Sequence, residues 1–129
     1  MPLKIILILI IINFVICGNS NNNYHSHKRK LPLIIKHPKN FTISNETTSL
    51  VFDCELDKSN TTKARVSWFK DGLRLVPDEK KYHLLANNSL LVSLVNIEED
   101  HGIYYCKAQN NYGSVVSNNA TVGVTCKFD

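Results

Sequence analysis

The side chains in this chain that could take part in chemistry are a run of carboxylates and a few scattered histidines. Glu98, Glu99 and Asp100 are consecutive, and paired carboxylates can act as general acid and base. His37, His83 and His101 could serve as bases. A nucleophile needs such a base within hydrogen-bond reach and a third group that orients it, and no motif of that kind accompanies these histidines. The sequence therefore predicts no catalytic residues, and we expect that the chain is not an enzyme.

Metal and cofactor sites are not indicated either. His25 and His27 lie in a polar stretch without further ligands, which makes a poor metal site. The sequence contains no glycine-rich phosphate loop. The chain has four cysteines, Cys17, Cys54, Cys106 and Cys126. They lack the close spacing of zinc ligands. We therefore expect neither a metal nor a cofactor.

Residues 1–18 have the pattern of a signal peptide. Lys4 provides a short positive start, an apolar run extends from Ile5 to Cys17, and the small residues Gly18 and Ser20 follow where a peptidase could cut. The run is shorter than the about 20 apolar residues of a transmembrane helix, although an uncleaved anchor is the alternative. No second apolar run of membrane length follows. The sequence thus predicts a secreted, extracellular product without a membrane span.

Residues 19–30 form a polar segment that ends in Lys28-Arg29-Lys30, and we expect a flexible basic arm. The whole chain has a net charge of +4. The 15 Lys and Arg residues, less Lys4 and the three cations of the arm, leave 11 against 11 Asp and Glu, so the remaining domain is neutral. The arm could bind polyanions, be cut by a processing protease, or be a solvated linker. Neutrality and secretion together disfavour a nucleic-acid partner.

Residues 31–129 are predicted to form one all-β domain. Apolar residues make up 43% and charged residues 20% of the chain, as in globular proteins with a core. Alternate residues from Leu50 to Leu56 are apolar, which is typical of a strand with one buried face. His37-Pro38 interrupts the first strand, and Asp71-Gly72 indicates a tight hairpin. The predicted strands are 31–36, 41–44, 50–56, 65–70, 73–75, 82–86, 90–95, 103–109 and 114–124.

Three stretches carry a family resemblance: Trp68 to Gly72, Asp100 to Cys106, and Ala108 to Gly113. Together with Cys54 they resemble the intermediate-set domains of the immunoglobulin superfamily. The resemblance implies a two-sheet antiparallel sandwich of the I-set, over residues 31–129, with one inter-sheet disulfide.

The same resemblance assigns roles to single residues. Cys54 and Cys106 would form the disulfide, and Trp68 would pack against it. Tyr104, two residues before the second cysteine, would pin the corner between strands E and F. Asp100 would tie down the same turn, and Gly102 belongs to the same signature.

Within the I-set, local matches resemble the N-terminal domain of roundabout axon-guidance receptors. They lie at Ile34 to Pro38, His83 to Leu85 with Ser89-Leu90, and Ser117 to Thr121. This likeness implies a recognition module for a leucine-rich-repeat ligand of the Slit type, helped by heparan sulfate. The segment before Asp100 is shorter here than in those receptors, so Val95 and Ile97 should not both point inward.

Alternative functions remain open. The domain could be a generic adhesion module that pairs with another immunoglobulin domain. The chain could be a secreted soluble modulator, or a fragment of a longer cell-surface receptor. The discriminating feature is a set of cations on and around strands C and C′, namely Lys63, Arg65, Lys70 and Arg74. If they cluster, a sulfated glycan or an acidic protein patch is the expected partner. If they pair with Asp53, Glu55 and Asp71, they form an ordinary solvated surface.

Two further features concern a secreted chain. Five asparagines fit the N-glycosylation rule, and Asn60 and Asn87 are best placed because they lie in predicted loops: Asn40, Asn45, Asn60, Asn87 and Asn119. Cys126 has no partner if Cys54 and Cys106 pair. An odd cysteine suggests a disulfide-linked dimer or an incidental free thiol.

Overall fold

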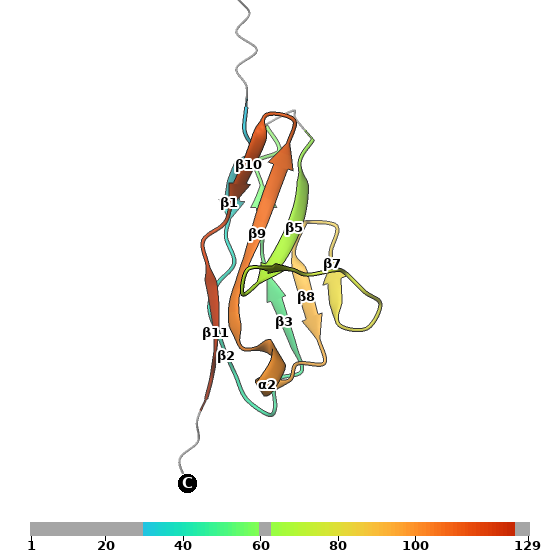
Figure 1. Ribbon diagram of the computed structural model, residues 1–129, viewed down its shortest axis with the longest axis vertical. Coiled ribbons are helices and arrows are strands. Elements are labelled where there is room, and N and C mark those ends of the chain that lie inside the picture. Colours follow the sequence, from blue (N-terminus) through green and yellow to red (C-terminus); the bar gives the residue numbers. More distant parts are fainter. Residues whose placement is uncertain (1–29, 60–62, 126–129) are drawn as a thin grey trace, which may run out of the picture.

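The computed structural model describes residues 30–59 and 63–125, which form a two-layer β-sandwich with its long axis along the strands (Figure 1). One layer contains β1 (Ile34–Lys36), β4 (Glu55–Leu56), β3 (Ser49–Phe52), β8 (Leu90–Ser93) and β7 (Tyr82–Leu84). The other contains β2 (Phe41–Ile43), β11 (Ala120–Val124), β9 (Gly102–Asn110), β5 (Arg65–Lys70), β6 (Leu73–Arg74) and β10 (Gly113–Val116). The predicted immunoglobulin-like sandwich is confirmed.

Several sequence predictions fall outside the described residues. They are the signal peptide at 1–18, the basic arm up to residue 29, the sequon at Asn60, and Cys126. None of the helical segments within residues 30–59 and 63–125 has the length and hydrophobicity needed to cross a bilayer.

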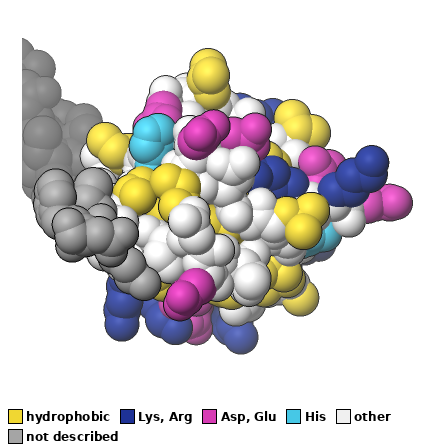
Figure 2. All heavy atoms as spheres, turned by 90° about the horizontal axis from the view of Figure 1, so that it is seen from below, with side chains coloured by type: hydrophobic (Ala, Val, Ile, Leu, Met, Phe, Trp, Pro, Cys, Tyr) yellow, Lys and Arg dark blue, Asp and Glu magenta, His cyan; other side chains and the backbone are white. Residues whose placement is uncertain are grey.

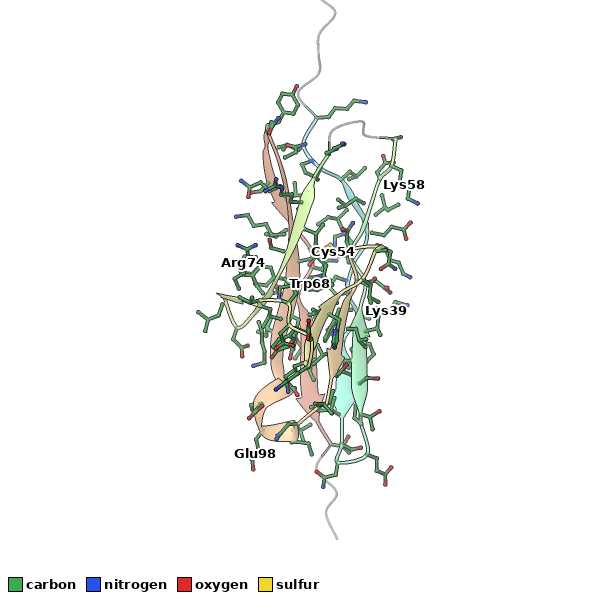
Figure 3. The ribbon with its side chains drawn as sticks, turned by 90° about the vertical axis from the view of Figure 1, so that its right-hand side faces the viewer. Lys39, Cys54, Lys58, Trp68, Arg74 and Glu98 are labelled. Atoms are coloured by element: carbon green, nitrogen blue, oxygen red, sulfur yellow. A yellow bond between two sulfur atoms is a disulfide. The ribbon has the colours of Figure 1, made fainter. Side chains whose placement is uncertain are left out.

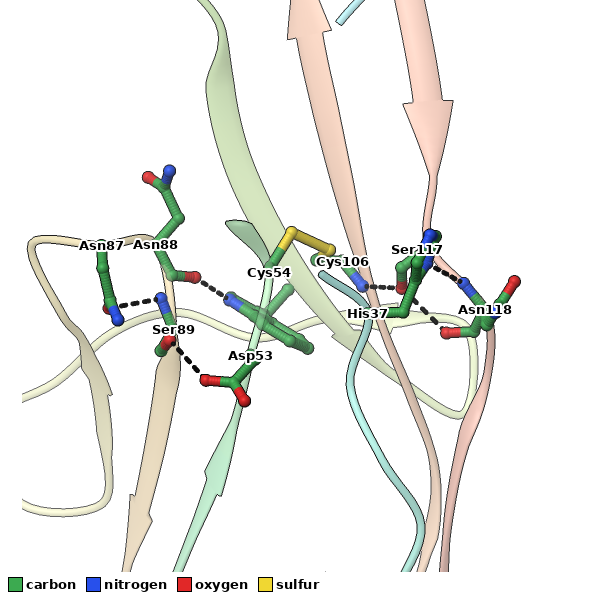
Figure 4. Close-up of a disulfide and its surroundings, with 10 residues drawn as sticks. His37, Asp53, Cys54, Asn87, Asn88, Ser89, Cys106, Ser117 and Asn118 are labelled. Atoms are coloured by element: carbon green, nitrogen blue, oxygen red, sulfur yellow. Dashed lines mark hydrogen bonds between the residues drawn. A yellow bond between two sulfur atoms is a disulfide. The ribbon is translucent and has the colours of Figure 1, made fainter. Parts of the chain in front are cut away.

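The first strand changes sheets at His37-Pro38, as predicted. β1 pairs with β4 antiparallel, and β2 pairs with β11 parallel. The His37 ring fastens the crossing point, because its Nδ1 accepts a hydrogen bond of 3.0 Å from the backbone N–H of Asn118 (Figure 4). The crossing therefore lies beside the interruption between β10 and β11.

Two predicted strands are interrupted in the structure. The strand predicted at 114–124 is divided into β10 and β11 because the Ser117 hydroxyl takes over a strand position: its Oγ accepts from the Cys106 N–H at 2.9 Å. The strand predicted at 50–56 is divided after Phe52, where the pairing partner changes from β8 to β1. Alternation in sequence marks which side chains are buried, but it does not mark where a strand changes its partner.

The core is organised around Phe52 and the disulfide. The Phe52 ring stacks on Tyr104 with ring centroids 4.5 Å apart, and it also contacts Phe41 and Trp68. Cys54 and Cys106 are bonded, as the resemblance implied, with Cα atoms 6.4 Å apart. Trp68 lies opposite Cys106 in the β5–β9 register, next to the disulfide, and its Nε1 donates to the Asn88 carbonyl at 2.9 Å (Figure 4). The two sheets are thus joined covalently at the point of densest aromatic packing.

The corner between β8 and β9 contains a helical turn, α2 (Ile97–Asp100), that was not predicted. The Tyr104 hydroxyl donates to the Asp100 carbonyl at 3.0 Å, as the resemblance implied. The Asp100 side chain is fully buried, and its Oδ2 accepts from the Asn96 N–H at 2.7 Å and from Lys81 Nζ at 2.9 Å. Lys81 was not recognised in the sequence as the partner of this carboxylate.

One residue shortly before α2 has an unusual backbone conformation. Leu94 has a φ of 53° and is 73% exposed, although leucine rarely adopts a positive φ. Val95 packs against the core, whereas the half-buried Ile97 is not part of it. The expectation that Val95 and Ile97 do not both point inward is therefore met. The backbone strain in this segment lies at Leu94, which has the positive φ.

Gly102 is required by its close approach to the β5–β6 turn. Its φ is 141°, and a Cβ atom on this residue would lie 2.6 Å from Asp71 Oδ2. Asp71 Oδ1 accepts from the Ile103 N–H at 2.9 Å, which joins the hairpin to β9. Asp71 and Gly72 both have positive φ, as a tight hairpin requires. The hydrogen bond from Ile103 and the ammonium of Lys70 lower the pKa of the Asp71 carboxyl.

Candidate binding surface

The carboxylates and histidines considered for acid–base chemistry either stabilise the fold or lie apart from one another. Asp100 is buried and bound to Lys81, whereas Glu98 and Glu99 are exposed on α2, so the three do not form a carboxylate pair around a cleft. His37 is the acceptor of the Asn118 N–H. In the part of the chain that the structure describes, no group of three or more His, Cys, Asp or Glu could hold a metal ion.

Three cations gather where β5 lies beside β9 and β6. Arg65, Arg74 and Lys107 line one open hollow of about 530 Å³, which we call the basic hollow. Ser67, Gln109 and Asn88 complete much of its wall. Lys107 had not been singled out, although the sequence carried the signal: it follows the buried Cys106 on β9 and so must point outward.

The other two predicted cations lie elsewhere. Lys63 lines a neighbouring hollow of about 430 Å³ that it shares with Arg65 and Gln109. Lys70 has the same parity as the inward-facing Trp68, and its Nζ pairs with Asp71 at 2.9 Å. Its side chain is only 17% exposed. The predicted group of four is therefore divided: Arg65 links the two hollows, and Lys70 belongs to the hairpin turn.

The acidic residues proposed as neutralising partners lie mostly on the other sheet. Asp53 pairs with Lys36 at 3.1 Å, and Glu55 is on β4. Within residues 30–59 and 63–125, none of the three cations of the basic hollow forms an ion pair. Their charge therefore faces solvent.

An apolar strip lies beside the basic hollow on the outer face of the second sheet. The rings of Phe69 and Tyr105 stack with centroids 5.1 Å apart and an interplanar angle of 3°. Ile103 and Val116, on the neighbouring strand segments, are 42% and 59% exposed. We call these four side chains the outer strip. An apolar strip beside unpaired cations is typical of a protein-binding surface.

The opposite sides of the molecule differ in character. In the side view of the ribbon, Arg74 projects on one side, whereas Lys39 and Lys58 project on the other (Figure 3). Seen from the end that carries α2, acidic and apolar side chains reach the surface, and the Lys and Arg side chains lie mostly toward the rim (Figure 2). The strand register places the cations of the basic hollow on the face that carries the outer strip, because Arg74 lies opposite Phe69, and Arg65 and Lys107 alternate in step with Phe69 and Tyr105.

The described sequons lie outside the strands that carry the basic hollow, although one of them adjoins it. Asn40, Asn45, Asn87 and Asn119 are all exposed, and none of them is on β5, β6 or β9. The Asn40 side chain already accepts from the Thr121 N–H at 2.8 Å. Asn87 adjoins Asn88, which lines the basic hollow, so a glycan on Asn87 would stand at the margin of this surface.

A family model described as "Immunoglobulin I-set domain" matches residues 32–124. Human protogenin is 28% identical over 95 residues, covering 70% of this chain and 8% of protogenin. Protein sax-3 of Caenorhabditis elegans is 29% identical over 100 residues, covering 70% of this chain and 8% of sax-3. Human contactin-4 is 26% identical over 115 residues, covering 88% of this chain and 10% of contactin-4. The chain thus spans about a tenth or less of the length of these relatives.

Solved structures show the same fold. Tandem immunoglobulin repeats of Dlar superpose with a TM-score of 0.63 at 21% identity, covering 73% of this chain and 48% of that chain. The family model supports the immunoglobulin superfamily and the I-set. Protogenin, sax-3 and contactin-4 agree with it, and they do not single out roundabout receptors. The matched family is also consistent with the expectation that the chain is not an enzyme. With its disulfide, its tyrosine corner and a family match over most of its length, this chain belongs to the immunoglobulin I-set family.

Proposed function

We propose that this domain is an extracellular recognition module of the adhesion or guidance type, which binds a protein ligand through the outer strip and the basic hollow. The observation that carries the proposal is the position of three cations, none of which forms an ion pair among the described residues, beside a partly exposed apolar strip on one sheet face. Relatives such as protogenin, sax-3 and the contactins belong to cell-surface adhesion and guidance proteins, which supports the same class.

The charge of the basic hollow favours an acidic partner. Exposed cations accelerate encounter with an acidic surface and fix its orientation, and salt weakens this effect over about 8 Å at physiological ionic strength. A leucine-rich-repeat ligand of the Slit type, with heparan sulfate as a co-ligand, is the finer form of the proposal. It rests on the local resemblance to roundabout receptors and on the arrangement of Arg65, Arg74 and Lys107.

The first test uses immobilised heparin. The triple variant Arg65→Ala, Arg74→Ala and Lys107→Ala should elute at lower salt than the unaltered chain. The matched control replaces Lys39, Lys58 and Lys80 by Ala, which removes the same charge from residues that do not line the basic hollow; Lys39 and Lys58 lie on the side opposite Arg74 (Figure 3). Equal elution of the two triple variants would show that net charge, not the basic hollow, holds the glycan. Deletion of Lys28-Arg29-Lys30 tests the contribution of the arm separately.

The outer strip favours a second candidate, which is pairing with another immunoglobulin domain. Val116→Asp places a charge within the strip without altering the core, because Val116 is 59% exposed. Beads coated with the unaltered chain should aggregate if copies pair, and beads coated with the variant should not. Aggregation that survives Val116→Asp would exclude the outer strip as the pairing surface.

The proposal also includes the features that mark an extracellular chain. Expression in secreting cells should release a product that begins after residue 18, and glycosidase treatment should lower its mass. On a non-reducing gel the unaltered chain should show a dimer band that Cys126→Ser removes. Retention of the first 18 residues in the cell membrane would favour the uncleaved anchor.

A further inference from the structure

The second sheet has an open edge along the first half of β5. β6 pairs only with Phe69 and Lys70, and the last bond on that side runs from the Leu75 N–H to the Trp68 carbonyl at 2.8 Å. In an antiparallel sheet alternate residues bond to the same side. Val66 therefore directs its N–H and its carbonyl toward the open edge, where the described strands offer no partner.

An apolar pocket lies directly beside this edge. It has a volume of about 110 Å³, and its lining is mainly apolar, with Ser67 and Arg74 as the two polar residues beside Val66, Trp68, Leu75, Pro77, Leu84 and Leu90. An engineered cavity of about 150 Å³ holds benzene, so this pocket suits one aliphatic side chain of valine or leucine size. Leu84, at the mouth of the pocket, is 44% exposed. The pocket is thus open to a side chain that approaches along β5.

The basic hollow adjoins the same edge from the outer side. Val66, Ser67, Arg74 and Leu84 line both the pocket and the hollow. No Asp or Glu contributes to either wall. An occupant of the edge would therefore meet an apolar site on the inner side and cations on the outer side.

We propose that the open edge of β5 binds an extended segment of a protein partner as an added strand, with an aliphatic side chain in the Trp68–Leu90 pocket and the adjacent acidic side chains in the basic hollow. Successive side chains of a strand point to opposite faces, so the recognised pattern alternates acidic, aliphatic and acidic residues. Backbone hydrogen bonds to Val66 supply binding, and the two side-chain sites supply specificity. The inference goes beyond the proposed function, because it requires the strand edge rather than the outer strip.

The test uses a short peptide with acetyl and amide ends in which glutamate alternates with valine, and a control peptide of the same composition with its glutamates grouped together. Amide spectra of the chain are recorded during titration. The alternating peptide should slow hydrogen exchange at the Val66 amide and bind at least roughly tenfold more tightly than the control peptide. A heparin oligosaccharide should shift the amides of Arg65 and Lys107 without slowing exchange at Val66.

Two variants separate the edge from the charge. Pro77→Trp blocks the pocket at an exposed position that does not line the basic hollow, so it should abolish peptide binding and leave heparin retention intact. Arg74→Glu should weaken the peptide roughly tenfold, whereas Lys39→Glu, on the opposite side, should not. Equal binding of the two peptides, binding without protection at Val66, or no binding at millimolar peptide would each overturn the inference. The inference shares the basic hollow with the proposed function, but Val116→Asp should leave peptide binding unchanged, so failure of the outer strip and failure of the strand edge can be told apart.

Discussion

Replacing Lys81 by methionine should destabilise the domain strongly, although Lys81 lies at the surface of a loop. Its Nζ is 2.9 Å from Asp100 Oδ2 and 3.4 Å from the Leu94 carbonyl. Asp100 is fully buried, and its other oxygen, Oδ1, has no hydrogen-bond partner. Lys81→Met would leave this carboxylate with only the Asn96 N–H as a partner.

Removing one member of a buried ion pair costs about 3–5 kcal/mol. The Lys81 side chain is 20% exposed, so water can partly replace the ammonium, and we expect the lower end, about 3 kcal/mol. For a domain of this size that corresponds to a fall in Tm of roughly 12–24 °C. Methionine keeps most of the side-chain length, so the loss of packing is small.

The assay is denaturant unfolding followed by the fluorescence of Trp68, the single tryptophan, which is buried. The matched control is Lys80→Met, because Lys80 is exposed and its side chain joins no ion pair among the described residues. The double variant with Asp100→Asn completes a double-mutant cycle. If Lys81→Met and Lys80→Met differ by less than about 1 kcal/mol, or if the cycle is additive, the ion pair does not hold this corner.

Three further variants test other features of the fold. Tyr104→Phe removes the bond to the Asp100 carbonyl and should lower the free energy of unfolding by about 0.5–1.5 kcal/mol, and an unchanged denaturation midpoint would contradict the tyrosine corner. Leu94→Gly should raise the free energy of unfolding by about 1 kcal/mol, because glycine adopts the positive φ freely. Leu94→Ala should not raise it, and equal effects of the two variants would refute backbone strain at Leu94. The pKa of Asp71 is lowered on folding from 3.8, so its contribution to stability is complete above that value and is lost as the pH falls through the folded pKa. Asp71→Asn should therefore weaken the acid dependence of the urea midpoint, and an unchanged dependence would count against this role.

Two kinds of sequence pattern made parts of the fold predictable. One is the alternation of inward and outward side chains along a strand, and the other is the fixed signature of the immunoglobulin family. Val66 and Trp68 were placed inward and Phe69 outward by simple parity, and the structure agrees. The disulfide followed from the resemblance. Breaks in strands were not predictable in this way, because Ser117 ends β10 through a hydrogen bond to Cys106 that depends on the folded arrangement.

The candidate surface was only partly predictable. Arg65 and Arg74 were identified from their strands, and Lys107 could have been found because it alternates with the buried residues of β9. Lys70 was grouped wrongly with them, since the same parity places it on the inner side, next to Asp71. The Lys81–Asp100 pair joins a loop residue to the last residue of α2, and no local sequence pattern predicts such a contact.

The parallel pairing of β2 with β11 determines how the domain responds to mechanical load. The described residues begin at one end of the long axis and finish at the other (Figure 1). Tension applied to the two ends pulls β2 and β11 in opposite directions along their length, so the hydrogen bonds between Phe41–Ile43 and Val122–Val124 are loaded together in shear. Bonds loaded together resist more force than bonds that are unzipped one at a time. Once the β2–β11 hydrogen bonds break, the Cys54–Cys106 disulfide still prevents the chain between these two cysteines from extending. The two cysteines are 52 residues apart in sequence. A force applied to both ends of the described domain would therefore be resisted chiefly by the β2–β11 pairing.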